Sequence, residues 1–176
     1  MAATGGLHQD GLADTLDGIG GGSTPGERLR IMRDPSIGAI GATALVLDIA
    51  LRFTGLQALP DETRQQILLC FPMFGRWGIV IGAWGARYAR SDGGVAAPFL
   101  AELSWREVVL ATAVLLPVAI WQLGWLPTLV CGGLTILVAR GMTRMGERLC
   151  GGMTGDLMGA TNEMVEIVVL LSAPVL

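Results

Sequence analysis

The stretch VVLATAVLLPVAIWQLGWLPTLVCGGLTILVA, residues 108–139, holds no charged side chain. A helix crosses the hydrocarbon core of a bilayer in about 20 residues, so this stretch is too long for one crossing and somewhat short for two. Pro117, Gly124 and Pro127 interrupt it. Because proline and glycine disfavour helix continuation, we expect a tight turn near residues 122–127 between two short or tilted membrane helices.

The rest of the chain has the same character. Of its 176 residues, 52% are hydrophobic and only 15% are charged, whereas soluble domains carry about 25% charged residues. This hydrophobicity excludes a disordered chain, and the formal net charge of −3 excludes a basic nucleic-acid-binding protein. The composition is that of a membrane-integrated protein.

Other apolar runs flank the uncharged stretch. Residues 37–58 are interrupted by only two charged side chains, and residues 65–86 by only one. A last run, 164–176, contains one carboxylate and is short for a full crossing. The sequence therefore predicts an all-α polytopic membrane helix bundle with four transmembrane helices and a candidate fifth at the C-terminus.

Arginine positions orient this bundle. The chain has no lysine, and its arginines gather in three groups separated by pairs of predicted spans: Arg28, Arg30 and Arg33; Arg87, Arg90 and Arg106; Arg140, Arg144 and Arg148. The positive-inside rule predicts that this side is cytoplasmic. Residues 1–176 then form a single domain with transmembrane helices and loops over 35–150. Polar, glycine-rich motif segments, 1–34 and 151–176, contribute an active site at its cytoplasmic face.

Three carboxylates recur at helical spacing in the segment DGLADTLDG, which begins at Asp10. In a helix, Asp10, Asp14 and Asp17 share one face, where their like charges repel. A hard divalent cation relieves that repulsion, and magnesium is typically held by one or two carboxylates together with substrate phosphates. The apolar residues between them would pack against membrane helices and direct the acidic face toward a cleft. A solvated acidic face that only caps a helix is the alternative.

The segment GGMTGDLMGATNEMVE, residues 151–166, is the second polar motif. A glycine-rich turn that leads into a helix presents free N–H groups and the positive end of the helix dipole, which favour anion binding. A helix that begins near Asp156 would place Asp156 and Glu163 on one face, with Glu166 one turn further. Together with the first acidic segment, this pattern indicates phosphoryl chemistry with a metal ion. Close helix packing is the alternative explanation of these glycines.

A few charged side chains lie inside the predicted spans. Arg76 is costly in lipid and is expected to face the bundle, with a phosphate or an acidic group such as Asp48 as its partner. Asp48 and Arg52 are four residues apart, which predicts a local ion pair on one helix. The single histidine, His8, is a general base, a substrate contact or a structural residue.

The three cysteines are widely spaced and form no CxxC pair, so neither a zinc site nor a disulfide is expected. Cys70, Cys131 and Cys150 are expected to act as small apolar residues within helices.

Four stretches together resemble the cobalamin synthase family, the adenosylcobinamide-GDP ribazoletransferases. They are, in the family's order, GGLHQDGLADTLDGIGGG at 5–22, ERLRIMRDPSIGAIG at 27–41, GRWGIVIGAWGARYAR at 75–90 and GGMTGDLMGATNEMVE at 151–166. The resemblance implies a magnesium-dependent transferase of the cytoplasmic (inner) membrane. Such an enzyme joins adenosylcobinamide-GDP to α-ribazole or its 5′-phosphate, with loss of GMP, in the last steps of cobalamin biosynthesis.

The resemblance also implies roles for individual residues. The implied metal ligands are carboxylates: Asp10, Asp14, Asp17 and Asp156. The implied substrate contacts are motif residues that face phosphate or developing charge: His8, Arg76, Thr154 and Gly155. The implied catalytic residues are again carboxylates: Asp14, Asp17 and Glu163. Asp17 and Glu163 are the candidates for the base that deprotonates the attacking hydroxyl.

Two other functions remain open at this point. Membrane CDP-alcohol phosphotransferases also bind magnesium and a nucleotide diphosphate through aspartates on membrane helices. Their pattern is Asp-Gly-x-x-Ala-Arg, whereas Asp10-Gly-Leu-Ala13 is followed here by Asp14 and no arginine. A non-catalytic cation carrier would hold its carboxylates at bilayer depth, whereas only Asp48 lies well inside a predicted span.

Members of the family usually have further membrane helices upstream of the His-x-Asp motif, whereas seven residues precede His8 here. We therefore expect a catalytic core that is N-terminally truncated relative to the family. Its expected partners are the two substrates and membrane lipid, without nucleic acid. A homo-oligomer is one arrangement left open.

Overall fold

The computed structural model describes residues 5–175, which form eight α-helices. The helices are α1 (Leu7–Gly21), α2 (Pro25–Ile31), α3 (Ala39–Ala58), α4 (Arg64–Ala83), α5 (Ala97–Glu102), α6 (Trp105–Leu123), α7 (Trp125–Cys150) and α8 (Gly155–Ser172), and a 3-10 turn, Ala173–Val175, follows. By length and composition α3, α4, α6, α7 and α8 with its following turn are able to cross a membrane. The predicted all-α polytopic bundle is confirmed, with α8 as the fifth span.

The uncharged stretch forms most of the hairpin of α6 and α7, as predicted. The turn is at Gly124, whose φ of 85° lies in the left-handed region that glycine adopts without strain. At the start of α6, the Glu107 carboxylate accepts a hydrogen bond from the backbone N–H of Ser104 at 2.7 Å, as in a capping box. Turn and capping residues therefore set the ends of α6 locally.

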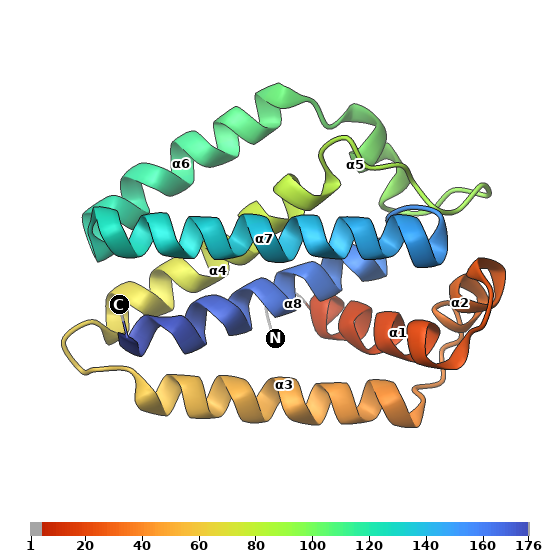
Figure 1. Cartoon of the computed structure of the whole chain (residues 1–176), viewed down its shortest axis with the longest axis horizontal. Helices are drawn as coiled ribbons and strands as arrows, with labels where there is room; N and C mark the ends of the chain where they lie inside the picture. Colours follow the sequence, from red (N-terminus) through yellow and green to blue (C-terminus); the bar gives the residue numbers. More distant parts are fainter. Residues whose placement is uncertain (1–4, 176) are drawn as a thin grey trace.

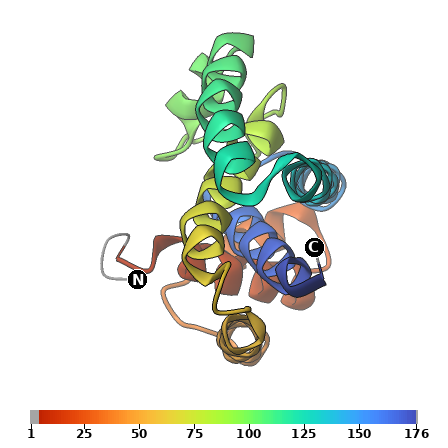
Figure 2. The same cartoon turned by 90° about the vertical axis from the view of Figure 1, so that its left-hand side faces the viewer.

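α8 lies at the centre of the bundle. Figures 1 and 2 show it between α3 on one side and α4 and α7 on the other, with α1 near its first half. Most of α8 is buried, whereas most of α3 and α6 is exposed. These two outer helices present apolar side chains outward, which is the arrangement of helices that face lipid.

Glycines let α1 lie directly against α8. A Cβ atom at Gly11 would lie 2.7 Å from the carbonyl oxygen of Asp156, and one at Gly159 would lie 3.2 Å from the Cα of His8. Such small residues allow two helix backbones to approach closely. The first turn of α1 therefore lies within the bundle, deeper than the membrane face to which the sequence assigned the whole of segment 1–34.

Apolar side chains fill much of the interior between the spans. One such cluster contains Phe74 and Trp77 of α4 with Cys70 and Cys131. These two cysteines and Cys150 are buried and free, so the expectation of small apolar residues without a disulfide is confirmed.

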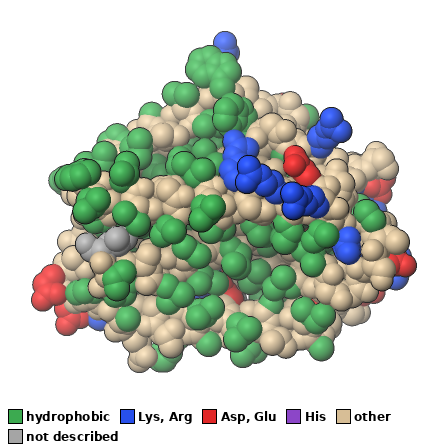
Figure 3. All heavy atoms as spheres, in the orientation of Figure 1, with side chains coloured by type: hydrophobic (Ala, Val, Ile, Leu, Met, Phe, Trp, Pro, Cys, Tyr) green, Lys and Arg blue, Asp and Glu red, His purple; other side chains and the backbone are tan. Residues whose placement is uncertain are grey.

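The three arginine groups lie at one end of the bundle, which we call the arginine end. Figure 1 shows α2, the segment after α4 and the last turns of α7 together at this end. In Figure 3 most of the visible basic side chains lie on the same half of the molecule. The Arg140 guanidinium lies 5.4 Å from the centroid of the Trp84 ring, and the same side chain donates to the Trp84 carbonyl at 3.1 Å.

Candidate active site

The aspartates of α1 lie on one helix as predicted, and the crossing of α1 and α8 brings Asp156 to them. Asp156 is in the first turn of α8. Burial raises the pKa of Asp14 to about 6, and the negative charges of Asp10, Asp156 and Asp17 add to this effect. The carboxylates of the two helices therefore repel one another, which is the electrostatic setting that a divalent cation relieves.

A cavity of about 400 Å³, which we call the acidic cavity, opens beside two of these carboxylates, Asp10 and Asp156. His8, Asp10, Arg90 and Asp156 are among its polar walls, and side chains such as Phe99 supply its apolar walls. Arg90 donates from Nη2 to Oδ2 of Asp156 at 2.6 Å. The acidic cavity thus combines carboxylates that suit a cation with a guanidinium that suits a phosphate.

Asp17 uses its carboxylate in another way. Its two oxygens accept hydrogen bonds from the backbone N–H groups of Gly38 at 2.7 Å and Gly41 at 2.8 Å. Gly38 is the N-cap of α3, where the first N–H groups have no partner within the helix. Asp17 therefore caps α3 from α1, with a charge that suits the helix dipole. Its metal-binding and catalytic roles stay predictions, and both oxygens already have partners.

The donor set fits a magnesium ion held mainly by substrate oxygens. Within residues 5–175 no group of three or more His, Cys, Asp or Glu side chains is placed to hold a metal ion by itself. Magnesium does not need such a group, because it commonly takes one or two carboxylates with phosphate oxygens and water. Asp10 and Asp14, one helical turn apart and mutually repulsive, offer two hard oxygen donors, whereas Asp156 is already paired with Arg90.

In a buffer with EDTA, Asp14→Asn is expected to raise the melting temperature near neutral pH. The pKa of Asp14 in the folded chain, about 6, lies above its ordinary value of 3.8. Ionised Asp14 therefore destabilises the fold above about pH 6, and this cost disappears below about pH 4, where the group is protonated in both states. The advantage of the variant should shrink as the pH falls between these values. Thermal unfolding in detergent measures it, and an advantage that grows toward acid would contradict this electrostatic assignment.

The glycine-rich turn before α8 serves close packing. The N–H of Gly152 donates to the carbonyl of Gly146 at 3.1 Å, and that of Met153 donates to the carbonyl of Arg87 at 2.7 Å. A Cβ atom at Gly152 would lie 2.9 Å from the backbone nitrogen of Ala89. These two amides are already bonded, so the turn at Gly152 fits the packing alternative better than an anion cradle.

Thr154 and Gly155 begin α8, within one residue of the predicted start. Thr154 is the N-cap: its buried hydroxyl accepts a hydrogen bond from the N–H of Leu157 at 3.1 Å. Gly155 is the first helical residue and lines the acidic cavity with Asp156. Both residues were predicted to contact substrate. Gly155 lies at the acidic cavity, whereas the Thr154 hydroxyl is engaged in the helix cap.

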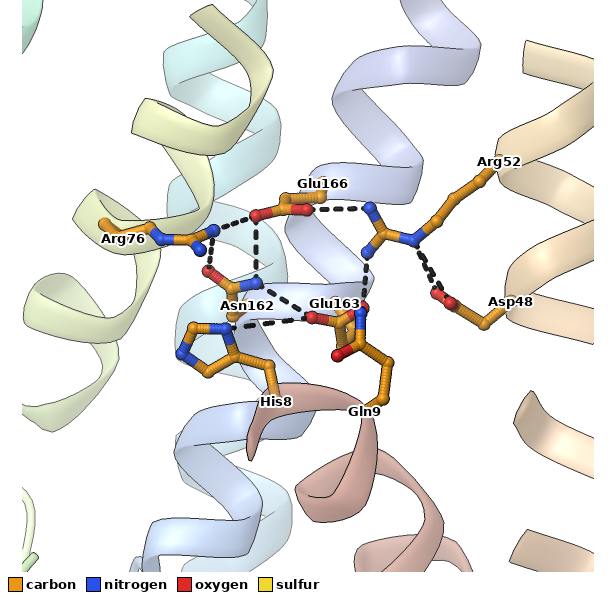
Figure 4. A network of polar contacts seen from close by, with 8 residues as sticks. All are labelled: His8, Gln9, Asp48, Arg52, Arg76, Asn162, Glu163 and Glu166. Atoms are coloured by element: carbon orange, nitrogen blue, oxygen red, sulfur yellow. Dashed lines mark hydrogen bonds and ion pairs between the residues drawn. The ribbon is translucent and has the colours of Figure 1, made fainter. Parts of the chain in front are cut away.

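A second polar cluster, which we call the buried network, lies in the middle of the bundle (Figure 4). Its members come from α1, α3, α4 and α8: His8, Gln9, Asp48, Arg52, Arg76, Asn162, Glu163 and Glu166. Arg52 donates to Asp48 on its own helix at 2.9 Å, which confirms the predicted ion pair. The same guanidinium pairs with Glu163 at 2.5 Å and with Glu166 at 2.7 Å, so it joins α3 to α8.

Arg76 has a different acidic partner from the one suggested by the sequence. It pairs with Glu166 and donates to Oδ1 of Asn162 at 3.0 Å, whereas Asp48 is taken by Arg52. The expectation that Asp48 is the only carboxylate well inside a span was wrong, because Glu163 and Glu166 lie within α8. The last apolar run looked too short for a span because the helix also includes the polar motif before it.

The buried network reaches the first turn of α1. Gln9 donates to Oε2 of Glu163 at 3.1 Å, and Nδ1 of His8 lies 3.9 Å from Oε1 of Glu163. Burial and the charge of Arg76 lower the pKa of His8, so its imidazole is neutral near pH 7. His8 lines both the acidic cavity and a second cavity of about 330 Å³ beside the network.

The structure thus divides the predicted site residues between two places. Asp10, Asp156 and Gly155 line the acidic cavity, with Asp14 near enough to feel the charges of both aspartates; Arg76 and Glu163 lie in the buried network, and His8 borders both. Sequence reasoning did not single out Gln9 and Asn162, and it used Arg90 only to orient the bundle. The one sequence signal for these three residues was that each lies within a stretch that resembles the cobalamin synthase family.

These features define a polytopic helical membrane protein with a carboxylate and arginine site near its arginine end. The chain belongs to the cobalamin-5-phosphate synthase family, whose profile matches residues 1–174.

Similar proteins carry the name adenosylcobinamide-GDP ribazoletransferase. The one from Syntrophobacter fumaroxidans is 38% identical over 171 residues, covering 95% of this chain and 67% of the relative. Those from Azorhizobium caulinodans and Bradyrhizobium diazoefficiens are 39% and 40% identical, covering 96% and 97% of this chain but 66% and 65% of the relatives. The chain therefore spans about two thirds of the length of these proteins. No solved structure matches the chain.

Proposed function

We propose that this chain carries the catalytic core of an adenosylcobinamide-GDP ribazoletransferase. A ribose hydroxyl of α-ribazole, or of its 5′-phosphate, attacks the cobinamide-side phosphorus of adenosylcobinamide-GDP. A new P–O bond forms, the bond to the GMP phosphate breaks, and adenosylcobalamin or its 5′-phosphate is released with GMP. Family membership supports this reaction, and the observation that carries it is the meeting of Asp10, Asp156 and Arg90 at one cavity, with the Asp14 carboxylate close enough to interact with all three charges.

The side chains suit the charges of that reaction. A magnesium ion, held by Asp10 and Asp14, would neutralise the diphosphate and polarise the attacked phosphorus. Arg90 offers a guanidinium to a phosphate oxygen, which is a strong, directional interaction. His8, neutral near pH 7, would accept a hydrogen bond from the attacking hydroxyl. Arg76 and Glu163 support the site from the buried network.

We further propose that the arginine end faces the cytoplasm in the cytoplasmic membrane. The three arginine groups lie at this end, and the opposite loops carry only Arg64 beside Asp61 and Glu62. By the positive-inside rule this asymmetry orients the five spans. Water-soluble substrates would then reach the acidic cavity from the cytoplasm.

The alternatives fit the geometry less well. A cation carrier needs carboxylates at bilayer depth that are free to bind its cargo, whereas Asp48, Glu163 and Glu166 are bonded to Arg52 or Arg76. The CDP-alcohol phosphotransferase pattern Asp-Gly-x-x-Ala-Arg is not matched here, because Asp14 and Thr15 follow Asp10-Gly-Leu-Ala in place of alanine and arginine.

The test supplies the chain in nanodiscs with adenosylcobinamide-GDP, α-ribazole and magnesium, and measures GMP and cobalamin by chromatography. A version extended upstream in the reading frame is assayed in parallel, since the relatives are longer. We expect product from at least one of the two, and none when magnesium is replaced by EDTA. Absence of product from both versions would overturn the proposal, and product in EDTA would overturn the role of the metal.

A further inference from the structure

A cleft of about 390 Å³ lies between α2 and the segment 89–92 at the arginine end. We call it the basic cleft. Three of its wall residues are arginines and one is an acid; the full wall consists of Gly26, Leu29, Arg30, Arg33, Ala89, Arg90, Ser91 and Asp92. Its charge is opposite to that of the carboxylates around the acidic cavity, which lies directly beside it.

Arg90 is a lining residue of both the basic cleft and the acidic cavity. Its guanidinium is held by Asp156. The backbone carries it rigidly, because Ala89 donates to the carbonyl of Met153 at 2.9 Å and Met153 donates back to Arg87. Within the described part of the chain, the buried Nε of Arg90 has no hydrogen-bond partner.

The other two arginines of the basic cleft, Arg30 and Arg33, are available to bind an anion. Arg33 pairs with Asp92 at 2.6 Å, but both side chains are about half exposed, and exposed ion pairs contribute little to stability. An anion in the cleft therefore competes with Asp92 at small cost. Arg30, which also lines the cleft, forms no ion pair with any of residues 5–175.

Phosphate is the anion that this arrangement suits. Guanidinium groups bind phosphate oxygens through paired, charge-assisted hydrogen bonds. The amides of Gly152 and Met153 are already bonded, so these two amides do not compete with the arginines as phosphate donors. A diphosphate placed at Arg90 would have its metal-binding oxygens toward Asp10 and its other phosphate toward Arg30 and Arg33.

We propose that the basic cleft binds the phosphate of the nucleotide that leaves in the reaction, with Arg30, Arg33 and Arg90 as its donors. The identity of that nucleotide as a guanosine monophosphate rests on the proposed function. A phosphate from a lipid headgroup has the same chemistry, but the contact with the acidic cavity through Arg90 favours the nucleotide. The cleft volume is also in the range of small-molecule sites.

The test measures GMP binding by calorimetry to the chain in zwitterionic nanodiscs, without a corrinoid substrate. Arg30→Gln is the test variant, because Arg30 has no ion pair to lose. Arg144→Gln is the matched control, an exposed arginine of α7 that does not line the cleft. We expect Arg30→Gln to weaken GMP binding about tenfold and Arg144→Gln to leave it within about twofold, as expected for a screened distant charge.

Equal affinities in the two variants would overturn the proposal, because general attraction to the arginine end would then explain binding. A parallel series adds phosphatidylglycerol to the nanodiscs. Retained GMP binding supports a nucleotide site, whereas loss of GMP binding would assign the cleft to lipid headgroups and overturn it. Turnover is measured separately. Turnover with Arg30-independent GMP binding would refute this inference alone. Arg30-dependent GMP binding without turnover in either length of the chain would support a nucleotide-phosphate site in the basic cleft while refuting the proposed reaction.

Discussion

Arg52→Gln is expected to prevent stable folding of the bundle. Arg52 is paired with Asp48, Glu163 and Glu166, and its loss leaves these buried carboxylates with Arg76 as the remaining cation of the network. Removal of one partner from a buried ion pair costs about 3–5 kcal/mol, which is comparable to the whole stability of many domains, about 5–15 kcal/mol. Yield and melting temperature in detergent, followed by size-exclusion chromatography, measure the effect.

The matched control for this prediction is Arg64→Gln. Arg64 pairs with Asp61 at 3.0 Å and donates to the Leu59 carbonyl at 3.1 Å, but its side chain is about half exposed and that of Asp61 is largely exposed; exposed ion pairs contribute about 0–1 kcal/mol. The control should therefore fold with a nearly unchanged melting temperature. Adding Glu163→Gln to Arg52→Gln should restore part of the lost yield, because one unpaired charge is removed. Similar melting temperatures for Arg52→Gln and Arg64→Gln would show that the buried network does not hold α3 to α8.

Asp14→Asn is expected to lower turnover at least about a hundredfold. Loss of a single group that stabilises charge in the transition state typically has an effect of this size. The substitution removes the charged donor that we propose for magnesium while it keeps the size of the side chain. Folding should be preserved, since ionised Asp14 is repelled by its neighbours. Product formation, in whichever length of the chain turns over, and melting temperature without EDTA measure both effects.

Asp17→Asn is the contrasting variant on the same helix face. Asp17 caps α3 through Gly38 and Gly41, and loss of a helix cap costs about 0.5–2 kcal/mol. We therefore expect a lower melting temperature with turnover reduced much less than in Asp14→Asn. Equal losses of turnover in the two variants would return Asp17 to the catalytic set and contradict its assignment as a cap.

Local features of the fold were predictable because their causes lie within a few residues. The uncharged stretch with Gly124 predicts the hairpin of α6 and α7, and the spacing of Asp48 and Arg52 predicts their ion pair. The spacing of the aspartates places them on one helix, and the arginine groups predict a common end. Each of these inferences depends only on helix period, turn chemistry or the length of an apolar run.

Contacts between helices were not predictable in the same way. Whether Arg76 meets Asp48 or Glu166, and whether Asp17 faces a metal or the N-terminus of α3, depends on how the helices cross. The glycine-rich sequence around Gly152 is compatible both with close packing against a backbone and with anion binding. Only its approach to Arg87 distinguishes the two uses.

The sequence by itself therefore determined the membrane class, the spans, the common end of the arginines and the acidic face of α1, because helical period and hydrophobicity are local properties. The tertiary structure alone decided the depth of α1, through the contact of Gly11 with α8. It also decided the division of the polar residues between the acidic cavity and the buried network. The physical reason is that the sequence does not distinguish among charged side chains that are far apart in the chain. Only the packing of the helices selects which of them become partners.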